Sequence, residues 1–590
     1  MNDLVATYAP SLAPYLLPHF VLIAGAALVL VLPFHALRAG ITVAVPLVAL
    51  AVIWEAVPRT LTVPLMGFDL ALMNQDTLSR AFGLVFCLAA ALAALYAWVA
   101  RSRLQQVATL LYAAAAVGAV FAGDLVTLFV WWEMTALTSV FLIWARGTPA
   151  AYGAGMRYLA WQVASGVALF AGVAIHTWQT GSTAFDRFDL GAFADTPGAW
   201  IILLAFGIKA AFPLLGGWLA DAYPSATITG TVAMSIFTTK MAIYALARGF
   251  AGTELLLVIG AAMALYPIVL AILADDLRRT LAYALNSQLG FMVVGVGIGT
   301  DDAIDGAVAH AICSVLYQAL LFMVVGAVML RANPGAAPRA ATSRVSQLSP
   351  AHSAARAMPV TFALLLVGAA SIAAVPGFSG FVSKAIVIDQ AAKGGLTWVW
   401  IALVAASAAT VVHTALKLPW MLWTHGAPDM REAPLPMLAA MVLTAAACIA
   451  IGVLPDVFYG VTPFRIEYEA YTLSHLISQG QLLAGAGLVF ALAIAFGLWP
   501  APRRSQLLDL DWLWRGFLWP VVGFSAQAIG VGYGEAARGV DWLWAGGKRA
   551  LAKGYGPRSR PARVLATGNM ALWIAILLGA ALFANLLDIR

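Results

Sequence analysis

The chain has 590 residues, of which 62% are hydrophobic and only 10% are charged, and its formal net charge is +6. A soluble protein would carry roughly 25% charged residues, so this composition excludes that class and indicates a polytopic membrane protein. The small basic excess suits loops that face anionic lipid, and no nucleic-acid partner is expected. The three cysteines lie in apolar runs without CxxC spacing, so we expect them to pack and predict no metal site.

Apolar runs of membrane-spanning length recur along the whole chain. A span needs about 20 mostly apolar residues, and on this basis we predict about sixteen spans. They cover approximately residues 15–34, 41–57, 77–100, 106–122, 125–145, 155–178, 199–220, 229–248, 254–275, 280–299, 303–331, 358–393, 396–424, 436–455, 481–500 and 566–588.

The basic residues predict the orientation of these spans. Arginine and lysine gather in the odd-numbered connections, for example at Arg38, Arg101 and Arg278, whereas the even-numbered connections hold more acids. Because cytoplasmic loops are enriched in basic residues, the odd connections are predicted in the cytoplasm and both termini outside. We therefore expect a multi-pass protein of the cell (inner) membrane.

Two long connections differ from the rest. Residues 332–357 are rich in Ala, Pro, Ser and Arg and are predicted to form a flexible cytoplasmic loop. Residues 501–565 combine several tryptophans with a basic end. This composition predicts an interfacial amphipathic segment on the inner leaflet, whose basic end contacts anionic lipid. Part of 516–534 could instead dip into the membrane.

Four ionisable residues stand singly in the middle of apolar runs: Glu133, Lys209, Lys240 and Lys384. Each costs at least ~2.5–3.5 kcal/mol at a helix centre, so such residues usually face a partner or a water path. Glu133 lies roughly 13 Å deep at 1.5 Å per residue. No base lies in the middle of its own span, so a partner must come from another helix. The alternative is a structural carboxylate paired with a lysine.

Lys209 is followed by Pro213 in the same apolar run. Proline removes a helix hydrogen bond and bends or breaks the helix. We expect this break to free carbonyl groups near Lys209 that can bind water. Burial favours the neutral form of a lysine and a nearby carboxylate favours the charged form, so this residue could load and release a proton. The alternative is a lysine that snorkels to the helix end.

Lys240 follows Thr239 in the middle of a predicted span, too deep for easy snorkelling. A proton-carrying lysine is one interpretation. The other is a lysine that is neutralised by burial or paired with an acid.

Lys384 follows a second interruption, formed by Pro376, Gly377 and Gly380, and Ser383 precedes it directly. Paired interrupted helices in two halves of a transporter are the best sequence indication of an ion site. A kinked packing helix with a snorkelling lysine is the alternative. His413 and Lys417 lie nearer the end of the next span, so snorkelling is expected for both.

His310, Ser314 and Gln318 are spaced at i, i+4 and i+8, which places them on one helical face. This polar stripe in an apolar helix predicts a hydrated file of side chains. Only His310 can titrate near neutral pH. A stripe that merely packs helices together is the alternative.

These motifs resemble the antiporter-like subunits of respiratory complex I and of Mrp-type multisubunit cation/proton antiporters. The resemblance covers roughly residues 60–425. Phe237–Arg248, Asp276–Gly299 and the tail residues Asp509–Trp512 are most similar to the D-type subunit of Mrp-type antiporters. The motifs are Trp-Glu at Glu133, Lys-x-x-x-Pro-x-x-x-x-Trp-Leu-x-Asp-Ala from Lys209, Thr-Thr-Lys at Lys240, Leu-Ala-Tyr-x-x-x-x-Gln-x-Gly from Leu281, and Gly-Phe-x-Ser-Lys at Lys384.

The resemblance implies an all-α fold of about fourteen family helices with two inverted five-helix repeats and broken helices. About two further spans and the interfacial segment would extend it. The implied domains are N-terminal helices (1–105), a first half-channel (106–248), a second half-channel (249–425), C-terminal helices (426–500), the interfacial segment (501–565) and a last helix (566–590).

The resemblance also implies residue roles. Glu133 and Lys209 would form the coupled pair of the first half-channel, Lys240 the central relay and Lys384 the end of the second half-channel. The family usually carries His-x-x-x-His-x-x-x-Lys where this chain has His310, Ser314 and Gln318. Ser and Gln hold water but take up no proton near neutral pH. Either the proton path is retuned, or the halves are uncoupled and the subunit is an accessory or altered-specificity form.

The leading hypothesis is a membrane subunit of a multisubunit monovalent cation (Na⁺)/proton antiporter. The alternative is a proton-conducting or structural subunit of a related redox or inorganic-carbon-uptake complex, and a stand-alone solute carrier is a third reading. The chain has no flavin, nucleotide or metal motif, so no cofactor and no catalytic chemistry of its own are expected. Other membrane subunits are the expected partners.

Overall fold

The computed structural model describes residues 17–55, 59–65, 68–332 and 348–500, with scattered residues between 538 and 580. The chain divides into two units, Met1–Asp511 and Trp512–Arg590. Within the described residues, 12 helices are long and apolar enough to cross a membrane, and three shorter apolar helices accompany them. The predicted all-α, multi-pass architecture is confirmed.

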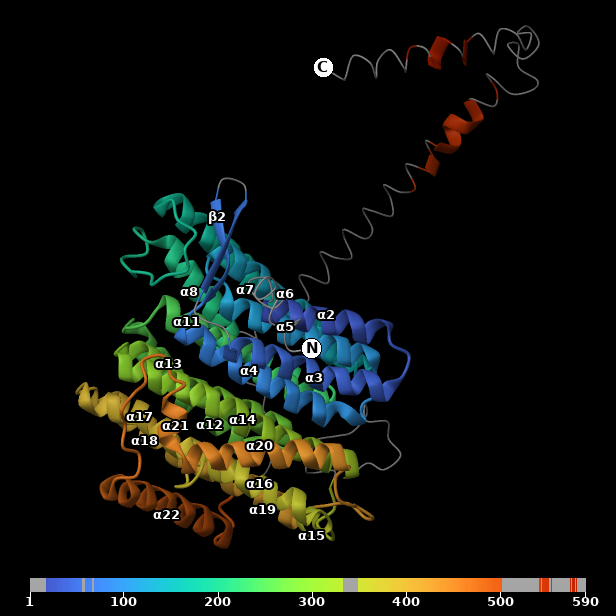
Figure 1. Ribbon diagram of the computed structural model, residues 1–590. Coiled ribbons are helices and arrows are strands. Elements are labelled where there is room, and N and C mark those ends of the chain that lie inside the picture. The colour runs from blue at the N-terminus through green and yellow to red at the C-terminus, as the bar shows by residue number, and fades with distance from the viewer. Residues whose placement is uncertain are drawn as a thin grey trace, which may run out of the picture. The chain divides into compact units, whose positions relative to one another are not determined.

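The N-terminal part of the first unit contains four apolar helices and a small β-hairpin (Figure 1). The hairpin was not expected from the sequence. Its strands are antiparallel and pair Thr60 with Asn74 and Val63 with Leu70. The elements are α2 (Pro18–Val31), α3 (His35–Glu55), β1 (Arg59–Leu65), β2 (Phe68–Gln75), α4 (Thr77–Tyr96), η2 (Ala97–Val99) and α5 (Arg103–Phe121).

Side-chain caps define where several helices begin. The Asp76 carboxylate accepts from the Ser79 N–H and caps α4 in a capping box. Asp124 does the same for the following helix by accepting from the Val126 and Thr127 N–H groups. The elements after α5 are α6 (Leu125–Trp144), α7 (Pro149–Thr180), α8 (Pro197–Ala210), α9 (Gly217–Ser225), α10 (Ile228–Ile236) and α11 (Thr238–Gly249).

The next part of the chain repeats the same order of spans. We call the five spans from α5 to α11 the first set and the five spans from α12 to α19 the second set. The fourth span is broken in both, into α8 and α9 in the first set and into α16 and α17 in the second. The fifth span is interrupted in both, between α10 and α11 and at the π-helical turn η4. The elements are α12 (Leu255–Leu273), α13 (Leu277–Ile298), α14 (Asp301–Ala332), α15 (Ala354–Ala357), α16 (Pro359–Ile372), α17 (Ser379–Lys393), α18 (Thr397–Thr410), η4 (Val411–Leu416) and α19 (Lys417–Thr424).

Three helices close the described part of the first unit: α20 (Leu435–Val453), α21 (Pro455–Tyr459) and α22 (Leu473–Ala495). Every predicted span up to residue 500 corresponds to described helices. The last predicted span, most of the interfacial segment and most of the 332–357 connection lie outside the described residues.

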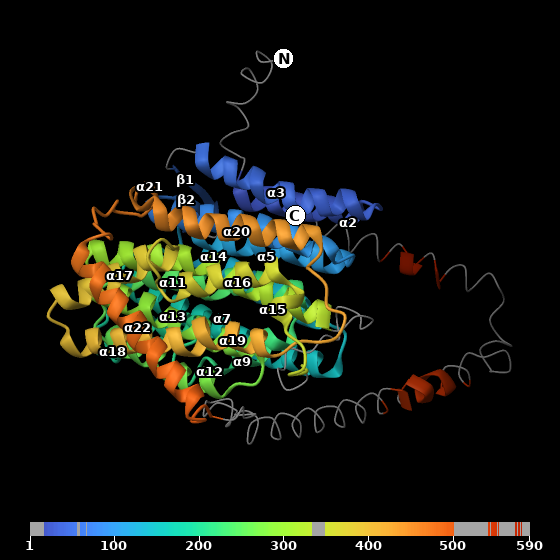
Figure 2. The ribbon, with the colours of Figure 1, turned by 90° about the horizontal axis from the view of Figure 1, so that it is seen from below.

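Helix α14 lies in the interior of the protein. It is buried from Ala303 to Met329 and packs against α13, α17, α10, α20 and α4. In Figures 1 and 2 it runs through the middle of the bundle, whereas α22 lies at the edge and is mostly exposed. A helix buried on all sides can carry polar side chains only where another helix or water meets them. α14 carries His310, Ser314 and Gln318.

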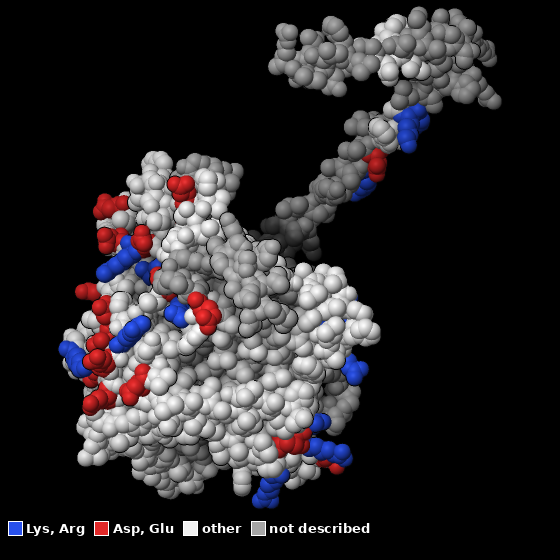
Figure 3. Space-filling view, in the orientation of Figure 1, with Lys and Arg blue, Asp and Glu red and all other residues white. Residues whose placement is uncertain are grey.

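Charged side chains gather at the two ends of the helices on the face in Figure 3, and a broad band without them separates the two groups. This distribution is the one expected when the band lies in the hydrocarbon of a bilayer and the ends lie in water.

Candidate functional site

Lys209 lies at the end of α8 and is fully buried. Its ammonium group donates to the main-chain carbonyl of Trp132 and, at 2.6 Å, to the Thr135 hydroxyl. It also lies 4.6 Å from the centre of the Trp132 ring, which adds a cation–π contact. α6 therefore supplies all the contacts found for this lysine, and its head group does not snorkel to the surface.

Glu133 lies next to Trp132 on α6 and packs against α7. A Cβ added to Gly166 would fall 1.5 Å from the Glu133 Oε1 atom, so only glycine leaves room for the carboxylate. This oxygen is buried and has no protein hydrogen-bond partner. The ion pairs found among the described residues do not include one between Glu133 and Lys209. The two groups are neighbours through Trp132, not a direct pair.

The break after Lys209 differs in one respect from the expectation. α8 ends at Ala210, and Ala211 and Leu214 on either side of Pro213 have positive φ angles of 62° and 69°. Such angles are uncommon outside glycine and accumulate at functional sites. Two carbonyls next to the break are bonded across it, and the first is that of Gly207, which accepts from the Phe212 N–H. The Ile208 carbonyl likewise accepts from the Ala211 N–H and, at 2.9 Å, from the Trp218 indole.

Lys240 is fully buried in the first turn of α11. Its ammonium group donates at 2.8 Å to the carbonyl of Ser235, in the last turn of α10. The interruption at Phe237 therefore frees a carbonyl that this lysine occupies. The neighbouring Thr239 hydroxyl is buried and has no protein partner.

Lys384 uses the second break in the same way. α16 ends at Ile372, and its last carbonyl accepts from the Lys384 ammonium group at 2.9 Å. The Lys384 ammonium lies 5.0 Å from the centre of the Phe291 ring. Gly377 has a φ of 90°, and a Cβ on Gly380 would fall 1.8 Å from the Ser371 carbonyl oxygen. Both glycines are thus needed for the geometry of this break.

Lys240 and Lys384 share one electrostatic arrangement: each ammonium group binds a carbonyl at the C-terminal end of a half-helix. This end carries the negative part of the helix dipole and attracts a cation. An ammonium group has three donors, and the structure gives each of these two lysines one carbonyl acceptor. The remaining donors can bind water, which is the usual partner of buried polar groups.

The predicted stripe on α14 has two different parts. His310 is bonded on both ring nitrogens, to the Ser383 hydroxyl at 3.2 Å and to the Tyr317 hydroxyl at 3.5 Å. Ser314 and Gln318 are fully buried, and none of their side-chain polar atoms has a protein partner. Together with the Thr239 hydroxyl beside Lys240 in the chain, four buried polar atoms of α11 and α14 have no protein partner. Such groups are normally bonded to ordered water.

Sequence reasoning missed the residues that extend this network. The Tyr317 hydroxyl donates to the side-chain oxygen of Gln288 at 3.5 Å. The side-chain NH₂ group of Gln288 donates in turn to the Thr410 hydroxyl at 3.2 Å. Gln288 belongs to the motif that begins at Leu281, but its spacing alone gave no role. Tyr317 lies two turns after His310, and that i+7 spacing was the only available signal.

The expectation that His413 and Lys417 snorkel is wrong. Both are fully buried, and the Lys417 ammonium group donates to the carbonyls of Ala271, Ile272 and Ala274 at 2.7–2.9 Å. Lys417 therefore caps the C-terminal end of α12 instead of reaching water.

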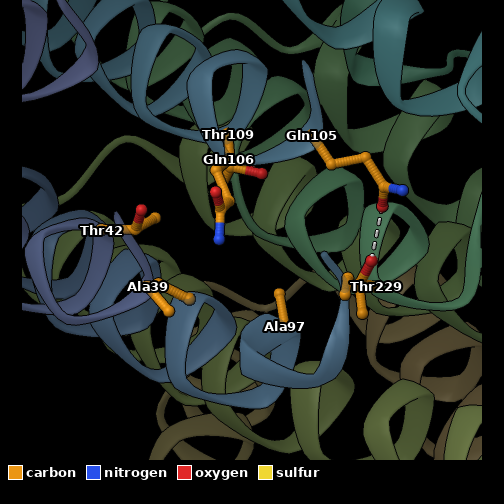
Figure 4. Close-up of a pocket in the computed structure, with 9 residues that line it drawn as sticks. Ala39, Thr42, Ala97, Gln105, Gln106, Thr109 and Thr229 are labelled. Atoms are coloured by element: carbon orange, nitrogen blue, oxygen red, sulfur yellow. Dashed lines mark hydrogen bonds between the residues drawn. The ribbon is translucent and has the colours of Figure 1, made fainter. Parts of the chain in front are cut away.

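A small polar cavity lies away from the predicted residues, among α3, α4, α5 and the start of α10 (Figure 4). Its volume of about 10 Å³ is enough for about one water molecule. The Gln105 side-chain oxygen accepts from the Thr227 and Thr229 hydroxyls at 2.9 and 2.7 Å. No titratable side chain lines this cavity, so it is not part of the candidate relay. The described residues contain no cluster of His, Cys, Asp or Glu suited to a metal ion.

The middle of the chain matches a known protein family. A family model described as "NADH:quinone oxidoreductase/Mrp antiporter, TM" matches residues 122–410. Residues 122–410 are thus similar to that family. The resemblance drawn from the motifs is thereby confirmed. Glu133, Lys209, Lys240, His310 and Lys384 all lie inside the region matched to the NADH:quinone oxidoreductase/Mrp antiporter family, whereas His413 and Lys417 lie just beyond it.

Individual proteins also resemble this chain over part of its length. An NAD(P)H-quinone oxidoreductase chain 4 of Microcystis aeruginosa is 30% identical over 340 residues, which are 55% of this chain and 59% of that protein. The chain thus spans less than two thirds of that curated relative.

Solved structures support the fold alone, because their identities are low. The structure of an Mrp complex from Dietzia sp. DQ12-45-1b has a chain with a TM-score of 0.70 at 23% identity, covering 97% of this chain and 63% of that one. The membrane-bound sulfane sulfur reductase, an archaeal respiratory membrane complex, has a chain with a TM-score of 0.68 at 22% identity, covering 96% and 99%.

Proposed function

We propose that this chain is a membrane subunit of a multisubunit monovalent cation (Na⁺)/proton antiporter and translocates protons through Glu133, Lys209, Lys240, His310 and Lys384. The observation that carries the proposal is the burial of three lysines inside an apolar bundle, none of them in a direct ion pair among the described residues. Ionisable groups in membrane spans mark ion pathways by default.

The proton moves in steps between these groups. Charge on one member changes the proton affinity of the next, because two nearby sites titrate as a coupled system. Glu133 and Lys209 form the entry pair, Lys240 is the central relay, and His310 with Ser383 leads to Lys384. Thr239, Ser314 and Gln318 hold the water that spans the interval between Lys240 and His310. Pro213, Pro376, Gly377 and Gly380 keep the two breaks open.

Transport against a membrane potential needs an external source of free energy. Moving one charge against 100 mV requires about 2.3 kcal/mol. We propose that this free energy comes from the gradient of a second cation. The complex that this chain forms with other membrane subunits would exchange that cation for protons. We further propose that the protein lies in the cell (inner) membrane with its odd-numbered connections on the cytoplasmic side, since these carry most of the basic residues. The basic C-terminal segment would then contact anionic lipid.

The second candidate is a proton-conducting or structural subunit of a related redox or inorganic-carbon-uptake complex. The similarity to an NAD(P)H-quinone oxidoreductase chain 4 and to a chain of a sulfane sulfur reductase favours it. Redox partners would then supply the free energy in place of a cation gradient.

To test the proposal, the chain is expressed together with the products of its neighbouring genes in a Na⁺-sensitive host that lacks its own antiporters. The antiporter proposal predicts growth rescue on NaCl and Na⁺-driven proton movement in everted vesicles. Glu133→Ala and Lys209→Ala should each abolish both. Glu254→Ala, which removes an exposed carboxylate without a capping bond, should leave both intact.

Two results would overturn the proposal. Rescue that persists in Glu133→Ala and Lys209→Ala would show that the assigned residues do not carry the transport. Absence of Na⁺-driven proton movement, with a quinone- or sulfur-dependent proton movement in the same vesicles, would favour the second candidate.

A further inference from the structure

His413 is a buried titratable residue that the proposed relay does not use. It lies in η4, the π-helical turn between α18 and α19. Its ring is fully buried, its Nδ1 atom bonds the Thr414 hydroxyl at 2.6 Å, and its Nε2 atom is buried without a protein partner. A π-helical turn inside an α-helix is rare and is frequent at functional sites.

The position of this turn matches that of Lys240 in the first set of spans. In both sets the fourth span is broken, at α8/α9 and at α16/α17, and carries one buried lysine, Lys209 or Lys384. In both sets the fifth span is interrupted near its middle. The first interruption is followed by Lys240, whereas the second contains His413 and is followed by Lys417. The second half thus has a titratable group where the first half has its central lysine.

A chain of hydrogen bonds leads from the relay to this turn. It starts at Ser383, beside Lys384, and passes through His310, Tyr317 and Gln288 to the Thr410 hydroxyl, with distances of 3.2 to 3.5 Å. Thr410 lies one helical turn before His413. The Ser407 hydroxyl, one turn earlier, is buried and also lacks a protein partner. The unbonded polar atoms of Ser407 and His413 flank the end of the chain of bonds and require water.

Two positive groups act on the ring, those of Lys417 and Lys384. The three donors of the Lys417 ammonium group are all used by carbonyls at the end of α12, so this group is held in place. Lys384 has one carbonyl acceptor and is free to exchange a proton. The elements packed against η4 are α12, α13, α16, α18, α19 and α22. Their other titratable side chains are Tyr266, Arg278, Arg279, Tyr283 and His475.

We propose that His413 is a further proton-relay residue, which exchanges a proton with Lys384 through bound water and serves the second half-channel as Lys240 serves the first. The proposal rests on the proposed function. In the forward step the Lys384 ammonium group gives up one proton and becomes a neutral amine. The Nε2 lone pair of His413 takes that proton, and the ring becomes an imidazolium. The positive charge of Lys417 disfavours that imidazolium, so the ring then gives the proton to the water bound at Nε2 and becomes neutral again.

The test measures cation-driven proton flux in vesicles that contain the complete complex. His413→Gln keeps a polar side chain that can bond Thr414 but cannot titrate. The proposal expects at least a fivefold loss of flux with normal assembly of the complex. His413→Lys, which puts a lysine where the first half has Lys240, should retain more flux than His413→Gln. His19→Gln is the matched control, because His19 is also a buried histidine with an unbonded ring nitrogen, and its flux should not change.

Two outcomes overturn this inference without touching the proposed function. Wild-type flux in His413→Gln would mean that the ring carries no proton. An equal loss in His413→Gln and His413→Lys would mean that the turn needs the shape of histidine and not a protonatable group. In either case loss of flux in Lys209→Ala still supports the main relay, whereas retention of flux in Lys209→Ala contradicts the proposed function itself.

Discussion

At the scale of single residues, the buried lysines are held by main-chain carbonyls instead of by acids. Lys240 and Lys384 each take a carbonyl that a helix interruption leaves free, and Lys417 takes three at the end of α12. A carbonyl is a fixed dipole that stabilises an ammonium group without neutralising it, so a lysine held this way can lose its proton without leaving an unpaired carboxylate in the membrane.

The sequence located these residues well and their partners poorly. Charge in an apolar run is visible from composition, and so are the prolines and glycines of the two breaks. The carbonyl that each lysine binds depends on how two half-helices meet, which no local pattern encodes. For the same reason the sequence did not show what each of these two residues contacts: Lys209 binds the Trp132 carbonyl, and Glu133 packs against Gly166.

Substitutions of Gln318 test whether the departure of this chain from the His-x-x-x-His-x-x-x-Lys pattern affects transport. The Gln318 amide is buried without a protein partner, at the position where the resemblance to the family implies a lysine. Gln318→Lys adds a group that can hold a proton, and we expect the transport rate and its dependence on pH to change. Gln318→Met, similar in size and apolar, should reduce flux by displacing water. Flux and pH profile equal to wild type in both variants would remove position 318 from the path.

At the scale of elements, close contact between α6 and α7 positions the Glu133 carboxylate. Gly166 is the point of contact, because a Cβ there would overlap the carboxylate oxygen. Gly153 lies on the same helix, and the nearest atom to a Cβ there is the end of the Arg157 side chain at 3.4 Å. Alanine is compatible with helix at both positions, so the two sites differ only in what the added methyl group meets.

Gly166→Ala should therefore displace Glu133 and reduce proton flux by about tenfold or more, which is less than the roughly 10²–10⁴-fold that a positioned proton-transfer group contributes. Gly153→Ala should change flux by less than about twofold, since alanine only adds roughly 0.5–1 kcal/mol of helix preference. Equal flux in the two variants would separate Glu133 from the contact with α7. Assembly of the complex is measured in parallel.

The elements themselves were predictable to different degrees. Spans follow from apolar length, and the breaks follow from proline and glycine, so both were found from the sequence. The β1–β2 hairpin was missed, because it lies in a short connection without a strong turn signal. The π-helical turn at His413 was missed because one extra residue in a helical turn leaves no mark in an apolar sequence.

In the whole molecule, each of the two sets of five spans carries titratable groups inside the apolar bundle. The first set holds Glu133, Lys209 and Lys240, and the second holds His310 and Lys384. Helix α14 of the second set also contacts α10 and α11 of the first. We propose that its water-binding side chains connect the two sets, that protons cross the chain along these groups, and that Lys384 is the terminal lysine.

The most direct test measures proton flux through the purified complex in proteoliposomes, under an imposed Na⁺ gradient, with a pH-sensitive dye inside. Lys384→Met removes the buried terminal lysine, and Lys393→Met removes a lysine of the same helix whose side chain is 63% exposed and pairs with Asp389. We predict a loss of at least about tenfold in Lys384→Met, since a positioned proton-transfer group contributes roughly 10²–10⁴-fold, and little change in Lys393→Met. Wild-type flux in a fully assembled Lys384→Met complex would contradict it.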